Sequence, residues 1–150
     1  QSFRYLLAGD GPEKDPLNTL ARQCGVSERV RFAGAVAHAE LPQLLSNSDL
    51  FVQPSQGEEA FGISVVEAMA CGLPVLASDN GGLPEIVVDG ETGRLLPPGD
   101  VAAWCAAIAS ASEPVLRGRW GEAALKRADA EFTWAANAAK LEAELMKGAG

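Results

Sequence analysis

Two glutamates, Glu59 and Glu67, lie in the most informative stretch of the chain, with seven residues between them. This stretch, residues 58–74, has the sequence E-E-A-F-G-I-S-V-V-E-A-M-A-C-G-L-P. Only Glu59 gives the seven-residue spacing, so we expect its neighbour Glu58 to be a surface residue. A carboxylate repels phosphate but accepts hydrogen bonds from hydroxyl groups. The pair therefore suits a ligand with hydroxyls on both sides of a phosphate, which describes a sugar nucleotide.

The residues around the two acids predict a strand, a loop and a helix. Residues 50–52 are apolar and suit a buried strand, and residues 62–70 suit a short helix that Gly72 and Pro74 end. A helix N-terminus at the carboxyl end of a parallel strand presents unpaired N–H groups and a partial positive charge, and can hold a phosphate. Glu59 then lies in the loop and Glu67 lies about one and a half turns into the helix.

The same alternation of strand and helix runs through most of the chain. It predicts an α/β fold, a Rossmann-like parallel sheet with helices on both faces, followed by a helical C-terminal tail. Ligands of such sheets bind at the carboxyl ends of the strands. The predicted strands are residues 3–8, 30–33, 49–53, 74–78 and 93–96, and the loops at that edge are residues 9–12, 34–39, 54–62 and 79–82.

Two features outside the Glu59–Glu67 stretch lead to further expectations. Gly81 and Gly82 either form a plain turn or let a ligand approach the backbone closely, and the sequence leaves both possibilities open. After a predicted N-cap at Asp100, apolar residues recur at helical spacing and predict a stripe that faces the core. This stripe consists of Val101, Trp104, Cys105, Ile108 and Ala109.

Length and composition narrow the class of protein. The chain has 150 residues, of which 47% are hydrophobic, and a formal net charge of −8. We expect a single domain, residues 1–150, with a sizeable core. The acidic balance argues against nucleic acid and against direct contact with anionic lipid. No apolar run reaches the length of a membrane span. The predicted location is cytoplasmic, because the cysteines suit a reducing compartment.

Cofactor and metal sites are not expected. The three cysteines show no C-x-x-C spacing and favour free, buried thiols in a reducing cytoplasm. A single histidine and the absence of D-x-D and H-x-x-x-H patterns give no metal-ligand set. The turn Gly9-Asp10-Gly11 is not a dinucleotide-binding motif, because Lys14 occupies the place of its third glycine.

Residues 59–75, E-A-F-G-I-S-V-V-E-A-M-A-C-G-L-P-V, resemble the E-x7-E motif of retaining group 1 glycosyltransferases of the GT-B type. Similar motifs of that family's C-terminal, donor-binding half occur in the same order from about residue 3 to residue 135. They are Leu7–Pro12, Arg29–Gly34, Ser48–Val52, Asp79–Glu85 and Asp89–Leu96.

The resemblance implies a role for each residue of the candidate site. The substrate would be a nucleoside diphosphate sugar, with no cofactor and no metal. Glu59 would be the catalytic residue that binds hydroxyls of the transferred sugar, and Glu67 would bind the ribose hydroxyls. The sugar and diphosphate would be bound by Phe61, Gly62, Ile63 and Ser64, and the backbone near Val36 would lie beside the base.

The chain departs from the family pattern at its start. The family's donor domain usually opens with a unit whose Arg and Lys clamp the diphosphate, and neither Arg4 nor Lys14 lies in a matching motif. The N-terminal acceptor-binding domain is also absent from this sequence. We therefore expect an N-terminally truncated piece that binds nucleotide weakly and transfers no sugar, while the parent enzyme could be peripheral at the inner face of the membrane.

Other functions remain open on the sequence alone. A sugar-nucleotide epimerase or a phosphorylase could use the same fold, although no lysine suited to a pyridoxal cofactor lies near the predicted loops. A non-catalytic module that binds nucleotide sugars or assists assembly is the alternative from another class. Because a fold alone does not prove an activity, the glycosyltransferase hypothesis depends on Glu59 and Glu67.

Overall fold

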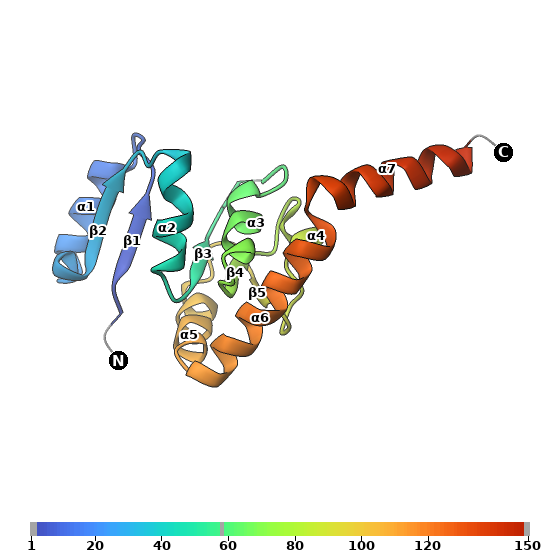
Figure 1. The fold of residues 1–150 in the computed structure, drawn as a ribbon. Coiled ribbons are helices and arrows are strands. Elements are labelled where there is room, and N and C mark those ends of the chain that lie inside the picture. The colour runs from blue at the N-terminus through green and yellow to red at the C-terminus, as the bar shows by residue number, and fades with distance from the viewer. Residues whose placement is uncertain (1–2, 58, 149–150) are drawn as a thin grey trace. The chain divides into compact units, whose positions relative to one another are not determined.

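The computed structural model of the chain describes residues 3–57 and 59–148. Five strands alternate with helices in this part of the chain, and the paired strands are parallel, as the sequence predicted (Figure 1). The chain folds as two compact units, residues 1–41 and 42–150. The single domain expected from the sequence stays a prediction.

The first unit is built on one pair of parallel strands. Tyr5 lies opposite Val30 in this pair, and at the carboxyl ends of the strands the Gly9 N–H donates to the Gly34 carbonyl at 2.8 Å. Its elements are β1 (Tyr5–Ala8), α1 (Lys14–Gln23), the 3-10 turn η1 (Ser27–Arg29), β2 (Val30–Gly34) and the 3-10 turn η2 (His38–Glu40).

The second unit contains a three-stranded parallel sheet in the order β3-β4-β5. Its strands are β3 (Phe51–Gln53), β4 (Val75–Ser78) and β5 (Gly93–Leu96). The helices are α2 (Leu41–Ser46), which begins at the unit boundary, α3 (Ile63–Ala70), α4 (Leu83–Ile86), α5 (Val101–Ala111), α6 (Pro114–Glu131) and α7 (Trp134–Gly148).

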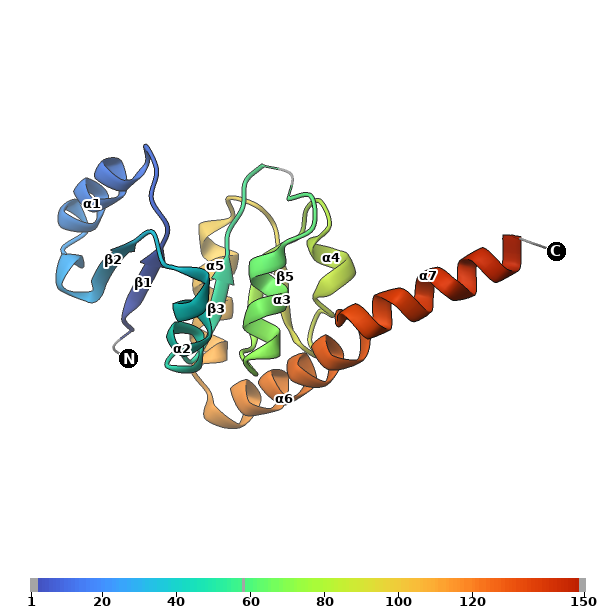
Figure 2. The ribbon, with the colours of Figure 1, turned by 45° about the horizontal axis from the view of Figure 1, so that its top comes forward.

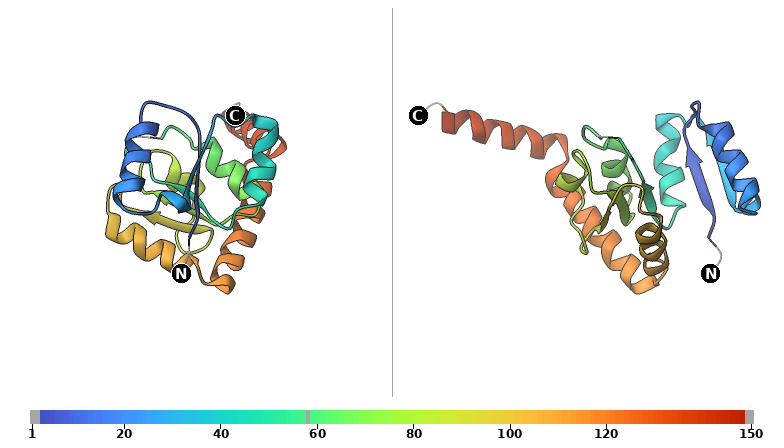
Figure 3. Two further views of the ribbon diagram at one scale, coloured as in Figure 1. Left: turned by 90° about the vertical axis from the view of Figure 1, so that its left-hand side faces the viewer. Right: turned by 180° about the vertical axis from the view of Figure 1, so that it is seen from behind.

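Helices cover both faces of this sheet, which explains why all four residues of β4 are fully buried. Side chains alternate along β4, so Val75 and Ala77 pack with α3, α4 and α6, whereas Leu76 packs with Trp104 of α5. Figures 2 and 3 show α5 on the face of the sheet opposite to α3. The near-continuous apolar character of the strand predicted this arrangement.

Helix α6 holds the other elements of its face together. Helix α6 lies close to the turn that follows α3, because position 121 is a glycine: a Cβ there would lie only 2.3 Å from the Gly72 carbonyl oxygen. The Trp120 indole N–H donates to the Gly90 carbonyl at 3.0 Å. The Arg127 guanidinium donates to the carbonyls of Ile86 and Glu85 at 2.8 and 2.9 Å, which fixes the end of α4.

Helix α5 begins as the sequence predicted but turns a different side toward the sheet. Asp100 accepts a hydrogen bond from the Ala103 N–H at 3.0 Å, which confirms the N-cap. The buried residues of α5 are Trp104, Ala107 and Ala111, whereas three members of the predicted stripe, Val101, Cys105 and Ala109, are exposed. The stripe prediction was therefore wrong in part, because small alanines rather than the larger residues fill the space beside Trp104.

The cysteine prediction is half confirmed. All three thiols are free of disulfide bonds, but Cys24 and Cys105 are exposed and Cys71 is half-buried, so the expected burial was wrong.

Helix α7 presents large apolar side chains to solvent, and Trp134 is 92% exposed. None of the helices in residues 3–57 and 59–148 is long and apolar enough to cross a membrane.

Candidate functional site

The candidate site lies where two loops of the second unit meet. Residues 54–62 follow β3 and residues 79–82 follow β4, and these neighbouring parallel strands end at the same edge of the sheet. The Gly82 N–H donates to the Glu59 carbonyl at 2.8 Å. The Asn80 side-chain amide donates to the carbonyls of Ser55 and Gly57 at 3.1 and 3.0 Å. The 79–82 turn therefore holds the loop that carries Glu59.

The glycine pair in the 79–82 turn allows this close contact. A Cβ at Gly81 would lie 2.2 Å from the Glu59 carbonyl oxygen, and a Cβ at Gly82 would lie 2.7 Å from the Ala60 carbonyl oxygen. Gly81 also has a positive φ of 53°, a conformation that favours glycine. The backbone that comes close to Gly81 and Gly82 is therefore that of the protein's own Glu59 loop.

The N-terminus of α3 offers unpaired backbone donors beside this loop. Gly62 precedes the helix in a left-handed conformation, with φ 89° and ψ 52°, and a Cβ there would lie 2.6 Å from a methyl carbon of Leu83. Within the described residues, the N–H groups of Gly62, Ile63 and Ser64 donate to no protein acceptor. An anion at this position would meet several donors and the positive end of the helix dipole.

A hydrogen-bonded network connects the end of β3 with the loop and with α3. Gln53, the last residue of β3, donates through its side-chain amide to Ser55 Oγ at 3.0 Å and to Glu59 Oε2 at 3.4 Å. The Ser64 hydroxyl donates to Gln53 Oε1 at 3.5 Å. Gln53 thus connects Glu59 and Ser64, two residues that were predicted from the sequence to belong to the site.

The remaining predicted residues occupy different surroundings. Glu67 is half-buried and lies on α3 with Ser64 three residues before it, on the side away from the buried Val65, Ala68 and Met69. Val36 is half-buried between β2 and η2 in the first unit, and its predicted contact with the base stays a prediction. Glu58 lies outside the described residues.

Phe61 is supported from the junction between α6 and α7. Its ring contacts the ring of Phe132 edge to face, with centroids 6.3 Å apart. The Arg127 guanidinium lies 5.6 Å from the centroid of the Phe132 ring, so this support comes from the C-terminal helices. Phe61 remains 46% exposed.

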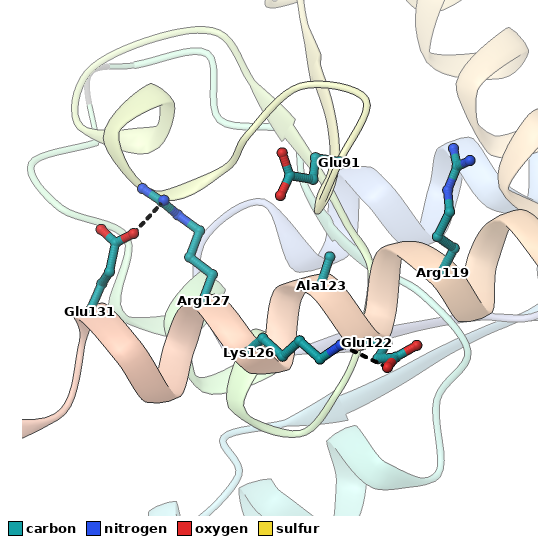
Figure 4. Close-up of a pocket in the computed structure, with 7 residues that line it drawn as sticks. All are labelled: Glu91, Arg119, Glu122, Ala123, Lys126, Arg127 and Glu131. Atoms are coloured by element: carbon teal, nitrogen blue, oxygen red, sulfur yellow. Dashed lines mark hydrogen bonds and ion pairs between the residues drawn. The ribbon is translucent and has the colours of Figure 1, made fainter.

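A separate groove of about 460 Å³ runs along the outer side of α6 (Figure 4). Its walls are charged with both signs, and Figure 4 shows Glu91 above Ala123 with Arg119 and Arg127 to either side. Arg127 is engaged with Glu131 and with the end of α4, so it has a structural role here. No residue predicted for the site lines this groove, whose residues are Glu91, Arg119, Glu122, Ala123, Lys126, Arg127 and Glu131.

We expect Asn80→Asp to destabilise the protein by about 1–3 kcal/mol, because a carboxylate would replace the donor that faces two carbonyls. Urea unfolding measures this difference. The matched control is Asn137→Asp on an exposed position of α7, which should change the free energy of unfolding by less than about 0.5 kcal/mol. Equal stability of the two variants would show that the Asn80 amide does not hold the loop.

Gln53 and Asn80 are the site residues that sequence reasoning missed. Each ends an apolar strand or follows one closely, which is where a parallel sheet places its functional side chains. That position was a usable signal. Their partners could not be inferred, because each reaches across to a loop whose path depends on the fold.

Comparisons with known proteins agree with this architecture. Residues 1–127 match the family model described as glycosyl transferases group 1. A glycogen synthase of Mycobacterium tuberculosis is 40% identical over 85% of this chain and 31% of its own length. A GDP-mannose-dependent phosphatidylinositol monomannoside mannosyltransferase of Mycolicibacterium smegmatis is 34% identical over 95% of this chain and 39% of its own.

Solved structures of related proteins share the fold. HepE of Anabaena in complex with UDP superposes with a TM-score of 0.87 at 30% identity, over 97% of this chain and 41% of HepE. The sucrose-phosphate synthase of Thermosynechococcus elongatus gives a TM-score of 0.82 at 33% identity, over 95% of this chain and 38% of the synthase. The chain thus spans well under half the length of these relatives. It belongs to the group 1 glycosyl transferases, the GT-B-type family that its motifs resemble.

Proposed function

We propose that this chain binds the donor in a retaining glycosyltransferase that moves a hexose from a nucleoside diphosphate sugar to a hydroxyl acceptor. One observation carries the proposal. The start of α3 presents unpaired N–H groups, and an acid stands on either side of them in the chain, Glu59 before and Glu67 after. Solved structures of HepE, 30% identical to this chain, hold UDP and UDP-glucose, which supports a nucleotide sugar as the ligand.

In this proposal each group has a distinct part in donor binding. The N–H groups of Gly62, Ile63 and Ser64 bind the diphosphate. As the bond to the sugar breaks, negative charge grows on the diphosphate, and donors already in place stabilise it without rearrangement. Glu67 accepts hydrogen bonds from the ribose hydroxyls. Glu59 accepts them from hydroxyls of the transferred sugar and holds its anomeric carbon in reactive geometry.

We propose that protein groups balance the negative charge of the diphosphate, and that no metal ion and no cofactor take part. These 150 residues contain no Arg and Lys in the family's phosphate-clamp motif. We therefore propose that the chain by itself binds nucleotide but transfers no sugar. Sugar transfer by the purified chain would contradict this proposal. The acceptor, and the remainder of the acceptor site, would be supplied by an acceptor-binding domain.

We expect Glu59→Gln to weaken binding of UDP-glucose about tenfold and to leave binding of UDP unchanged. The reason is that Glu59 accepts hydrogen bonds from the sugar and not from the nucleotide, and a hydrogen bond to a charged acceptor contributes about 1.5–3 kcal/mol. Calorimetric titration with both ligands measures the two dissociation constants. GDP with GDP-mannose and ADP with ADP-glucose are titrated in parallel, and the pair bound most tightly is used.

The outcomes of this titration separate the proposal from its rivals. An equal loss for nucleotide and nucleotide sugar would mean that Glu59 shapes the loop rather than contacts the sugar. Unchanged binding of both ligands would favour a non-catalytic module in which Glu59 has no part. Glu142→Ala, which alters an exposed acid of α7, serves as the control for the loss of one negative charge.

A further inference from the structure

We propose that Gln53 is the positioning residue of the donor-sugar site, which holds the Glu59 carboxylate in place relative to the first turn of α3. The inference rests on the proposed function, because it assigns to Gln53 an effect that is exerted through Glu59. It concerns a residue outside the E-x7-E stretch, and it follows from contacts that cross from the sheet to the loop and the helix.

The position of Gln53 makes it a rigid support. It is the last residue of β3 and lies opposite Ala77 of the fully buried strand β4, so its backbone is fixed by the sheet. Phe51, two residues earlier, packs on the face covered by α3, and the side chain of Gln53 points to the same face. Glu59, in contrast, lies six residues further on in a loop.

The chemistry of the amide suits this bridge. An amide carries donors at one end and an acceptor at the other, whereas an ionised carboxylate only accepts and an ammonium only donates. Gln53 therefore donates to Glu59 Oε2 while it accepts from the Ser64 hydroxyl. The orientation of the amide is determined by Glu59, because the opposite orientation would place two acceptors against each other.

The neutrality of Gln53 also matters at this site. A cation here would form an ion pair with Glu59 and compete with the sugar hydroxyls, whereas an anion would repel both Glu59 and the diphosphate. The contacts to Glu59 and Ser64 are long, at 3.4 and 3.5 Å, and Ser55 anchors the amide at 3.0 Å. Hydrogen bonds of this kind commonly shorten when the substrate binds.

The experiment compares Gln53→Met, which keeps the size of the side chain and removes its hydrogen bonds, with the unaltered chain. The measured quantity is the ratio of the dissociation constants for UDP and UDP-glucose, or for the pair among those named above that binds most tightly. We expect this ratio to fall about three- to tenfold through weaker binding of the sugar nucleotide alone. Gln43→Met, the same change at an exposed position of α2, should leave the ratio unaltered.

Two further variants keep the test decisive. Gln53→Glu retains the acceptor for Ser64 and places a second carboxylate beside Glu59, so we expect a larger fall in the ratio. In the Glu59→Gln background, Gln53→Met should change the ratio less than about twofold, because coupled residues do not act additively. Thermal unfolding of each variant confirms that it is folded at the temperature of titration.

Each result is assigned to one claim. If Glu59→Gln lowers the ratio but Gln53→Met does not, the positioning role is wrong and the proposed function stands. The role is also wrong if Gln53→Met weakens both ligands equally, or if its effect persists in full without Glu59. If the unaltered chain binds none of the donor pairs, the proposed function fails and this inference fails with it.

Discussion

Replacing Glu67 by alanine is expected to weaken binding of the preferred nucleoside diphosphate by about ten- to a hundredfold. The variant removes a charged acceptor for two ribose hydroxyls, and we expect a net loss of about 1.5–3 kcal/mol, the contribution of a hydrogen bond to a charged group. The loss should be the same for the nucleotide and for its sugar conjugate, since both contain the ribose. Calorimetric titration with UDP, GDP and ADP measures it.

A loss of affinity in Glu67→Ala could come from a lost contact with the ribose or from a less stable protein, and the two explanations can be tested separately. Its side chain is half-buried on α3, on the side away from Val65 and Met69, which pack in the core. Thermal unfolding of Glu67→Ala measures any loss of stability, and a loss of affinity at a temperature where the variant is fully folded is assigned to binding. Glu142→Ala on α7 is the control and should leave both stability and affinity unaltered. Unchanged nucleotide affinity in Glu67→Ala would favour a module whose acids no longer serve a donor site.

The second large effect is expected at Gly121, where α6 meets the C-terminal turn of α3. We expect Gly121→Ala to destabilise the protein by about 3 kcal/mol, because its Cβ would lie 2.3 Å from the Gly72 carbonyl oxygen and backbone cannot move aside as a side chain can. For a protein of this length, this corresponds to a fall of about 10 °C in the unfolding midpoint.

The same helix provides a matched control with the opposite sign. Gly118 lies three residues earlier, is exposed, and a Cβ there would meet no atom within 4 Å. Gly118→Ala should therefore stabilise the protein by about 0.5–1 kcal/mol, since alanine loses less conformational entropy in a helix. Differential scanning calorimetry of both variants checks the prediction. A rise or no change for Gly121→Ala would contradict the close packing of α3 on α6.

Much of the architecture was predictable because it depends on local patterns. Short, mostly apolar runs bounded by turn residues predicted the five strands, and β5 begins and ends at the predicted residues, Gly93 and Leu96. The N-cap at Asp100 and the break between α6 and α7 at Phe132 and Thr133 were also predictable from residue type. The group 1 family followed from the order of several motifs rather than from one.

The parts that could not be predicted depend on distant contacts. The roles of Gly81 and Gly82 were left open, because only the fold brings the Glu59 loop against them. The prediction of the side of α5 that faces the sheet was wrong in part, because the small side chains of Ala107 and Ala111 do not stand out as hydrophobic in the sequence. Arg127, more than forty positions from its partner carbonyl of Ile86, had the pattern of a solvated charge.

The most direct test of the central claim is a titration of the isotopically labelled chain with UDP, GDP and ADP, followed by amide NMR. At 15.6 kDa, the protein is small enough for each backbone amide to be observed separately. If the donor binds at the start of α3, the preferred nucleotide shifts the amides of Gly62, Ile63, Ser64 and Glu67 most strongly. Shifts concentrated instead in the α6 groove around Arg119 and Lys126, or no shifts at millimolar nucleotide, would contradict a donor site at the start of α3.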